Sequence, residues 1–250
     1  MKQPKKLHSS VDKSKRLWEL DTLRGIAILL MVLFHVIFDL NVFFGYEKLD
    51  YYQGFWFYEG RAAAIIFIIL VGVVSSLIYQ REEHVVSLQK NSYRGLRLIG
   101  LGLLITLVTF NLVRDNTIWF GILHFLGLSI LISIPLCRYK WLNVLLASIL
   151  FAAYIPIKTL YTDSYTGLIF GILPPDFSSY DHYALIPWLG FVLIGIALGN
   201  WIYPGGKGFI KREPNAIENM LAKTGKYSLW IYLIHQPLIL AFIWLYFRFL

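Results

Sequence analysis

Cysteine and charged side chains are both scarce in this 250-residue sequence, and each shortage excludes a class of protein. The single cysteine, Cys137, has no second cysteine for an intramolecular disulfide and cannot form a metal site built from cysteines. Charged residues make up only 15% of the chain, whereas a soluble domain has about 25%. The composition therefore excludes a secreted domain, a disordered chain and a soluble nucleotide-binding enzyme.

Apolar residues are abundant instead, at 57% of the chain, and the mean hydropathy is +0.60. A membrane-spanning helix needs about 20 predominantly apolar residues. Seven apolar stretches follow one another, and the third and fifth are short enough to need flanking cations that reach the interface. The sequence thus predicts an all-α, polytopic membrane bundle of about seven transmembrane helices. The stretches cover residues 22–44, 62–80, 96–113, 118–137, 141–157, 183–203 and 227–248.

The basic residues indicate how the chain is oriented. Residues 1–18 form a basic segment without apolar periodicity, which we expect to be a cytoplasmic tail before a single transmembrane domain over residues 19–250. If the spans alternate from there, 18 of the 23 Lys and Arg residues lie inside and 5 outside. This distribution obeys the positive-inside rule. The net charge of +8 therefore reflects membrane topology and not nucleic-acid binding, and we expect the cell membrane as location, with the C-terminus outside.

The two long loops that we expect outside the membrane, residues 45–60 and 159–182, are rich in Tyr, Phe and Trp. Such amphipathic rings suit a surface in contact with lipid headgroups or amphipathic ligands. A re-entrant segment at residues 166–173 is compatible with the sequence. No tandem repeat is detectable, and homo-oligomerisation is left open.

Ionisable residues inside spans are costly, so each one marks a candidate functional site. His35 follows Arg24 by eleven residues, which is about 16 Å along a helix and places it near the bilayer centre. Asp39 comes four residues later on the same helical face. Because a carboxylate beside an imidazole fixes its tautomer for general-base catalysis, we expect His35 and Asp39 to be catalytic. The alternative is a histidine held by a backbone carbonyl or a neighbouring helix.

Two more histidines, His124 and His235, are expected at a similar depth in the membrane. Pro237 opens the helix beside His235, and the freed carbonyl groups are tolerated only against protein or a wet cavity. We therefore expect His124, His235 and the adjacent Gln236 to line one polar chamber with His35 and to bind substrate. No close histidine pairing of the HExxH type occurs, so no metal is expected.

Arginines flank the spans at both membrane surfaces. Arg94 and Arg97 stand at i and i+3 on the expected inner side, where they are either a phosphate-binding pair or anchors beside anionic lipid. Arg61 is close to Glu59 on the expected outer side. It is either a clamp for an oxyanion or carboxylate of the substrate, or an interfacial anchor.

Several segments together resemble one known family in chain order. They are LDTLRGIAILLMVLFH, SYRGLRL, FGILHFLGLSI, ALIPWLGFVLIGIALG and TGKYSLWIYLIHQPLIL. These segments are similar to the heparan-α-glucosaminide N-acetyltransferase catalytic-domain family of bacterial and archaeal transmembrane acyltransferases. The resemblance implies transfer of an acetyl group from cytoplasmic acetyl-CoA to a sugar or glycan hydroxyl or amine outside the membrane. By position, it implies that Arg24, Arg94 and Arg97 hold the CoA phosphates and that His35 lies at the transfer point.

This sequence departs from the pattern of the family's animal members. Animal lysosomal members have an asparagine where this chain has His35, and their key histidine lies in the first luminal loop, whereas residues 45–60 contain none. A glucosamine acceptor is therefore not implied. The main alternative is a proton-coupled transporter or permease that uses the same polar chamber, although no inverted repeat supports it. The chain also lacks a GxxxxGK[ST] loop for ATP, and its last stretch lacks a lysine for a retinal Schiff base.

Overall fold

The computed structural model describes residues 16–46 and 48–249, and the regular structure within these ranges is helical. An isolated bridge between Tyr161 and Leu173 is the one pairing of extended backbone there. Among the described residues, five helices are long and apolar enough to cross a membrane, and two shorter apolar helices accompany them. The five are α1 (Trp18–Val42), α2 (Gly54–Arg81), α3 (His84–Leu112), α6 (Leu185–Ile202) and α8 (Ser228–Phe249), and the two are α4 (Ile122–Ser133) and α5 (Trp141–Ile157).

The all-α, polytopic membrane bundle is thereby confirmed, and each of the seven apolar stretches corresponds to a helix. Helix α3 is longer than the third apolar stretch, because it begins at His84 and includes the polar residues before residue 96. The short helices are α4 and α5. Within the 166–173 segment the chain forms a 3-10 turn, Tyr165–Gly167, and a re-entrant path stays a prediction. Most of the expected tail, residues 1–15, lies outside the described residues.

The eighth helix, α7 (Ala216–Lys226), contains many polar residues, so no apolar stretch of the sequence predicted it. Asn215 caps its N-terminus by accepting a hydrogen bond from the backbone N–H of Glu218. The Glu218 carboxylate in turn accepts a hydrogen bond from the backbone N–H of Asn215, which completes a capping box. Lys223 and Lys226 in the last turn stabilise the helix by their attraction to the negative end of the helix dipole.

The helices group into two compact units, a subdivision of the expected single domain that the sequence did not indicate. Unit 1 contains the described residues up to Ala63 together with those from Ile210 to Phe249. Unit 2 contains Ala64–Phe209. Helix α2 thus contributes its first turns to unit 1 and the remainder to unit 2.

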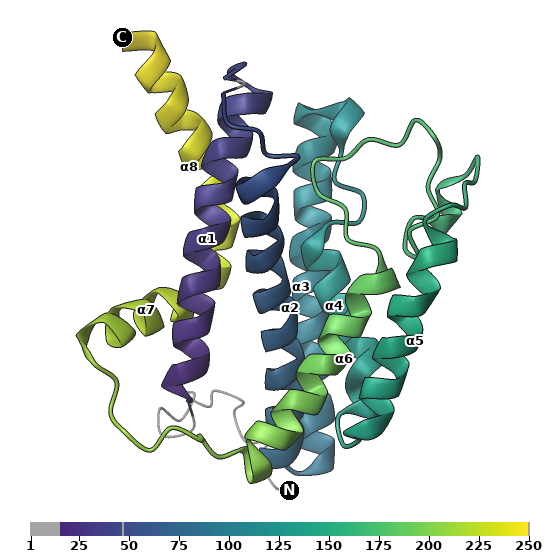
Figure 1. Ribbon diagram of the computed structural model, residues 1–250, viewed down its shortest axis with the longest axis vertical. Coiled ribbons are helices and arrows are strands. Elements are labelled where there is room, and N and C mark those ends of the chain that lie inside the picture. The colour runs from purple at the N-terminus through teal and green to yellow at the C-terminus, as the bar shows by residue number, and fades with distance from the viewer. Residues whose placement is uncertain (1–15, 47, 250) are drawn as a thin grey trace, which may run out of the picture. The chain divides into compact units, whose positions relative to one another are not determined.

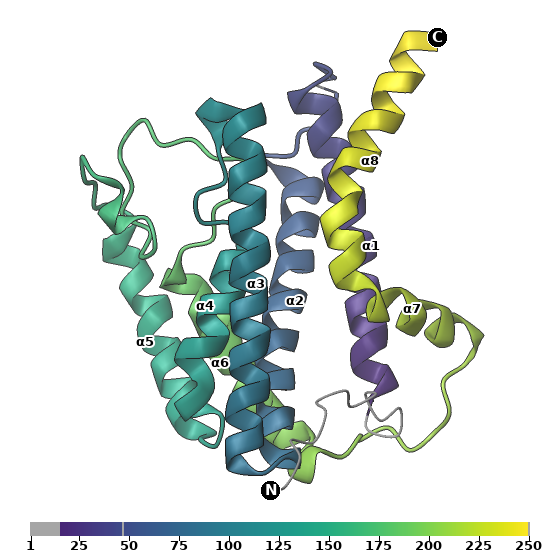
Figure 2. The ribbon, with the colours of Figure 1, turned by 180° about the vertical axis from the view of Figure 1, so that it is seen from behind.

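Unit 1 is built around α1, which has α8 alongside it and α7 against its N-terminal half (Figures 1 and 2). Two glycines allow α1 and α7 to touch through their backbones. A Cβ atom on Gly25 would lie 2.0 Å from the carbonyl oxygen of Leu221, and one on Gly225 would lie 1.8 Å from that of Asp21. Because any side chain would separate the two helices at this contact, these glycines fix the position of α7 on α1.

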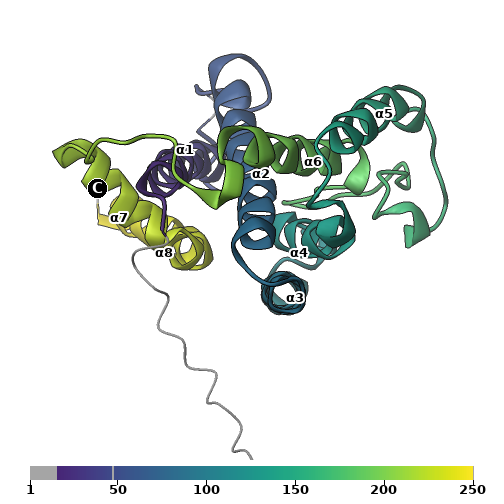
Figure 3. The ribbon, with the colours of Figure 1, turned by 90° about the horizontal axis from the view of Figure 1, so that it is seen from below.

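In unit 2, α4 lies between α3 and α6, and α5 packs on α6, as the view from below shows (Figure 3). The contact between α2 and α6 also depends on glycine, because a Cβ atom on Gly72 would lie 2.0 Å from the carbonyl oxygen of Val192. Gly195 and Gly199 of α6 likewise lie close to α2, at Ile69 and Ser76. Gly100 on α3, in contrast, has open space beside it.

Candidate functional site

Helices α1 and α8 bring two of the predicted histidines together in unit 1. The ring centroids of His35 and His235 are 4.6 Å apart, and the rings meet edge to face. His235 is buried and His35 is half-buried. Since both helices are otherwise strongly apolar, this contact creates a polar site where a membrane helix would ordinarily have none.

Each imidazole is held by a carbonyl group of its own helix. Nδ1 of His35 is 2.8 Å from the carbonyl oxygen of Met31, and Nδ1 of His235 pairs with the carbonyl oxygen of Tyr232. A carbonyl can only accept, so each Nδ1 carries the proton and each Nε2 of a neutral ring has its lone pair free. The Nε2 atom of His235 is buried and has no hydrogen-bond partner in the described part of the chain. Nδ1 of each ring is thus occupied, and the two Nε2 atoms are the basic nitrogens that remain for a reactant.

A carboxylate and an amide extend this cluster. The side-chain amide of Gln236 donates to Oδ1 of Asp39 at 2.6 Å, and Asp39 is completely buried. Oδ2 of Asp39 and Oε1 of Gln236 are buried without a partner among the residues described. We expected Asp39 to orient His35. In the structure the carbonyl group of Met31 pairs with Nδ1 of His35 and the amide of Gln236 donates to Asp39, and a catalytic role for Asp39 stays a prediction. The reason is local: the i−4 carbonyl is within reach of the His35 ring, while Asp39 faces α8.

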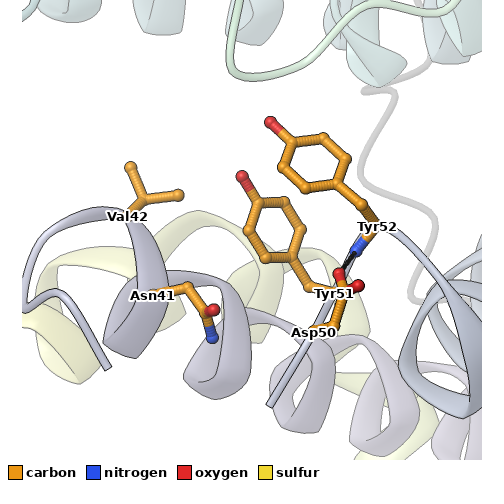
Figure 4. A pocket seen from close by; sticks show the side chains of 5 residues that line it. All are labelled: Asn41, Val42, Asp50, Tyr51 and Tyr52. Atoms are coloured by element: carbon orange, nitrogen blue, oxygen red, sulfur yellow. Dashed lines mark hydrogen bonds between the residues drawn. The ribbon is translucent and has the colours of Figure 1, made fainter. Parts of the chain in front are cut away.

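A small open pocket of about 340 Å³ lies in unit 1 at the C-terminal end of α1. Figure 4 shows the rings of Tyr51 and Tyr52 side by side, with Asp50 close to the backbone of Tyr52. The backbone N–H of Tyr52 donates to Oδ1 of Asp50 at 2.7 Å, which holds the turn that presents both rings. The lining residues are Asn41, Val42, Asp50, Tyr51 and Tyr52.

Phe38 connects this pocket to the histidine pair. Its ring meets that of Tyr51 edge to face with centroids 5.1 Å apart, and it lies 6.3 Å from the ring of His35. Phe38 stands one turn beyond Phe34 on α1, so the aromatic contacts run along one helix from the imidazole to the pocket. Aromatic rings beside a carboxylate and an amide are suited to bind a molecule with both apolar faces and hydroxyl groups.

The N-terminal end of α1 carries a cationic cluster. Asp21 accepts a hydrogen bond at 2.9 Å from Arg24 and two at 3.0 Å from Arg16. Two guanidinium groups around one carboxylate leave a net positive charge, which suits a phosphate group. Sequence reasoning found Arg24 but missed Arg16 and Asp21, although acidic residues in the first turn of a helix are a recognisable signal.

Arg94 and Arg97, the two candidate phosphate ligands on α3 in unit 2, have different surroundings. Arg94 donates to Oδ1 of Asn91 at 3.0 Å and lies 3.5 Å from Oγ of Ser75. Arg97 is exposed. The two side chains thus have different surroundings although they are three residues apart, and joint binding of one phosphate stays a prediction.

His124 belongs to unit 2, in the first turn of α4. Its Nε2 atom is 3.4 Å from Oγ1 of Thr106, and its ring stacks on that of Phe120. The hydroxyl of Thr106 donates to the carbonyl oxygen of Ile118, so it can accept from the imidazole. These contacts suit a packed structural histidine, and membership of one chamber with His35 stays a prediction.

The remaining predicted site residue, Arg61, lies on the exposed surface of the first turns of α2. Its guanidinium carbon is 4.4 Å from the centroid of the Phe57 ring, a cation–π contact. Within the described ranges, no group of three or more His, Cys, Asp or Glu residues is arranged to hold a metal ion.

The chain matches a protein family over most of its length. The family model described as "Heparan-alpha-glucosaminide N-acetyltransferase, catalytic" matches residues 16–237. The matched range includes the cationic cluster at the start of α1 and the His35–His235 cluster with Asp39 and Gln236. No curated protein and no solved structure matches the chain.

Proposed function

Because the chain belongs to the heparan-alpha-glucosaminide N-acetyltransferase catalytic family, a family of membrane acetyltransferases, we propose that it acetylates a sugar or glycan. The acetyl group comes from acetyl-CoA on the cytoplasmic side and goes to a hydroxyl or amine on the other side. One observation carries the proposal: the rings of His35 and His235 meet edge to face between two apolar helices, and Nδ1 of each ring is paired with its own backbone, which leaves Nε2 for a reactant. Apolar helices bury such a pair at a considerable energetic cost, which function would justify.

In the proposed reaction, Nε2 of His35 accepts the proton of the acceptor hydroxyl or amine. The acceptor atom then attacks the thioester carbonyl carbon, and a tetrahedral oxyanion forms. Its collapse breaks the carbon–sulfur bond, and the thiolate takes the proton back from the imidazolium, so that CoA leaves as the thiol. His235 holds the second reactant beside His35, and Asp39 with Gln236 supports the developing positive charge on the imidazole pair.

The donor would bind by its phosphates at Arg24, which Asp21 holds in place beside Arg16. Arg24 precedes His35 by eleven residues, so an extended pantetheine arm along α1 would cover about 16 Å to the imidazole. Arg94 and Arg97 in unit 2 are proposed as further phosphate contacts. The sugar ring of the acceptor would rest on Tyr51 and Tyr52 in the pocket at the other end of α1.

A cytoplasmic N-terminus and a multi-pass location in the cell membrane follow from the distribution of basic residues, which places the cationic cluster of α1 on the side of the donor. Lipid bilayer, acyl donor and glycan acceptor are the expected partners, and a homo-oligomer is left open. A histidine pair between membrane helices also suits a proton relay, so a proton-coupled transporter is the alternative that an experiment must exclude.

Sealed proteoliposomes that enclose an amino sugar or a glucoside distinguish the two functions. If the chain is an acetyltransferase, radiolabelled acetyl-CoA added outside the vesicles yields acetylated sugar within them and free CoA outside. The Arg94→Ala variant should slow this transfer. If the chain is a transporter, unmodified sugar crosses the membrane without CoA and Arg94→Ala has little effect, which would contradict the proposal.

A further inference from the structure

Glu59 is a buried carboxylate with no described counterpart. Its exposed fraction is 7%, and both of its carboxylate oxygens are buried without a hydrogen-bond partner among the described residues. A carboxyl group in this condition has lost its hydration without gaining a hydrogen bond from the protein, which is unfavourable for folding in an apolar surrounding. Such a residue is a candidate for binding something that comes from outside the chain.

The position of Glu59 links it to the histidine pair. It lies in the first turns of α2, within unit 1. The next residue, Gly60, packs directly on α1, because a Cβ atom there would lie 2.5 Å from the ring of Phe34. The Phe34 ring in turn is 5.5 Å from that of His35, edge to face. The turn of α2 that carries Glu59 therefore packs against the turn of α1 that carries His35.

The nearest cation in the sequence does not account for Glu59. Arg61 stands two residues later, and side chains two residues apart on a helix point to different faces. Its guanidinium group lies over the ring of Phe57. The buried face of this part of α2 consists instead of Glu59 and Ala63, one turn apart, and Ala63 has no polar side chain to offer.

We propose that Glu59 binds the acceptor. Its carboxylate accepts hydrogen bonds from a hydroxyl or ammonium group of the sugar while the attacking group of the same molecule faces His35. A carboxylate has room for about four hydrogen bonds from donors, and both sugars and amino sugars are rich in them. This inference rests on the proposed function only in requiring a sugar acceptor, and sugar binding can be measured without the donor.

The test compares Glu59→Gln with Glu19→Gln in the purified full-length protein. Glu19 is a matched control because its exposed fraction is also 7% and its Oε1 atom also has no described partner. It lies in the first turn of α1, far along the helix from the turn that carries His35. Glucosamine and glucose serve as probes, and the shift in thermal unfolding temperature at increasing sugar concentration gives the apparent affinity. With acetyl-CoA present, the acceptor KM and the acceptor-independent hydrolysis of acetyl-CoA are measured separately.

We expect Glu59→Gln to weaken sugar binding and to raise the acceptor KM at least tenfold. Acetyl-CoA hydrolysis should stay unchanged, and the unfolding temperature of the sugar-free protein should stay the same or rise. A larger loss for glucosamine than for glucose would identify an ammonium group as the ligand of Glu59, and an equal loss would identify a hydroxyl group. Glu59→Asp, which keeps the charge, should bind better than Glu59→Gln.

Two results would overturn the inference. One is a Glu59→Gln variant whose sugar affinity and acceptor KM equal those of the wild-type protein. The other is an equal loss in Glu19→Gln, which would show a general effect of removing a buried carboxylate. A protein that binds sugar through Glu59 but never turns over acetyl-CoA would instead contradict the proposed function alone.

Discussion

Each unit of the molecule buries a histidine, and the two surroundings differ in what they leave unpaired. In unit 1, three buried polar atoms of neighbouring residues have no described partner: Nε2 of His235, Oδ2 of Asp39 and Oε1 of Gln236. In unit 2, His124 binds Thr106, stacks on Phe120 and leaves one atom unpaired, Nδ1.

That atom of His124 faces the backbone of α3, because a Cβ atom on Gly102 would lie 2.8 Å from it. There is no room for a ligand atom at that contact. Depth in the membrane therefore does not identify a functional histidine, since all three were expected at a similar depth. A group of unpaired atoms from adjoining helices is the more informative sign, because native proteins rarely leave such atoms unpaired by accident.

The largest expected difference is between the two histidines themselves. His35→Ala should reduce acetyl transfer by roughly 10² to 10⁴-fold, the usual contribution of a general base. His124→Ala should keep transfer within a few-fold of the wild-type rate and lower thermal stability instead. Acetyl-CoA consumption and unfolding temperature of both purified variants check this, and equal losses of transfer would remove the distinction between the units.

The next effect concerns the glycine contacts inside each unit. Gly72→Ala in unit 2 and Gly225→Ala in unit 1 both place a Cβ atom against a backbone carbonyl group, so each should destabilise the protein by about 1–3 kcal/mol. Gly100→Ala is the control, because open space surrounds that position. Thermal unfolding in detergent gives the comparison, and a Gly100→Ala variant as unstable as the other two would contradict it.

A smaller effect is expected for the pairing between Asp39 and Gln236. Single and double substitutions to alanine should show a coupling of about 0.6 kcal/mol and at most about 1.7 kcal/mol, the average and the maximum found for hydrogen bonds between membrane helices. The coupling energy of this double-mutant cycle can be measured from the unfolding free energy or from the rate of acetyl transfer. Strictly additive losses would mean that the two side chains act independently and that the hydrogen bond does not hold α8 against α1.

Those contacts could not have been predicted from the sequence, which places Asp39 and Gln236 on helices at opposite ends of the chain. The apolar stretches predicted the seven apolar helices because burial in lipid requires long apolar runs. The same signal could not predict helix α7, because its residues are largely polar and it forms by capping and by contact with α1. The spacing of His35 and Asp39 suggested a pair within one helix, whereas short polar side chains there bind the facing helix or their own backbone.

The smallest expected effect is on the pH dependence of stability, and it has opposite signs in the two units. In unit 2, Asp181 lies in the loop between α5 and α6, where burial raises its pKa from 3.8 to about 6, although its hydrogen bond from the backbone N–H of Ile122 opposes this. The folded protein then holds a proton that the unfolded chain releases. The stability contribution of Asp181 should therefore fall as the pH rises from about 4 to 6.

In unit 1, hydrogen bonds from Arg212 lower the pKa of Glu218 on α7 from 4.5 to about 2. The stabilisation from Glu218 is present above pH 4.5 and is lost as the pH falls towards 2. Unfolding temperature measured against pH should lose its decline between pH 4 and 6 in Asp181→Asn, and its rise between pH 2 and 4.5 should weaken in Glu218→Gln. A wild-type curve without a decline between pH 4 and 6 would show that Asp181 ionises normally.

The most direct test of the central claim, that the His35–His235 pair is the place of acetyl transfer, is a density map of the protein with a non-transferable acetyl-CoA analogue. We expect the phosphates at Arg24 and the carbonyl group that replaces the thioester beside Nε2 of His35. An analogue bound with its acyl end beside His124, or outside the helices altogether, would contradict the claim.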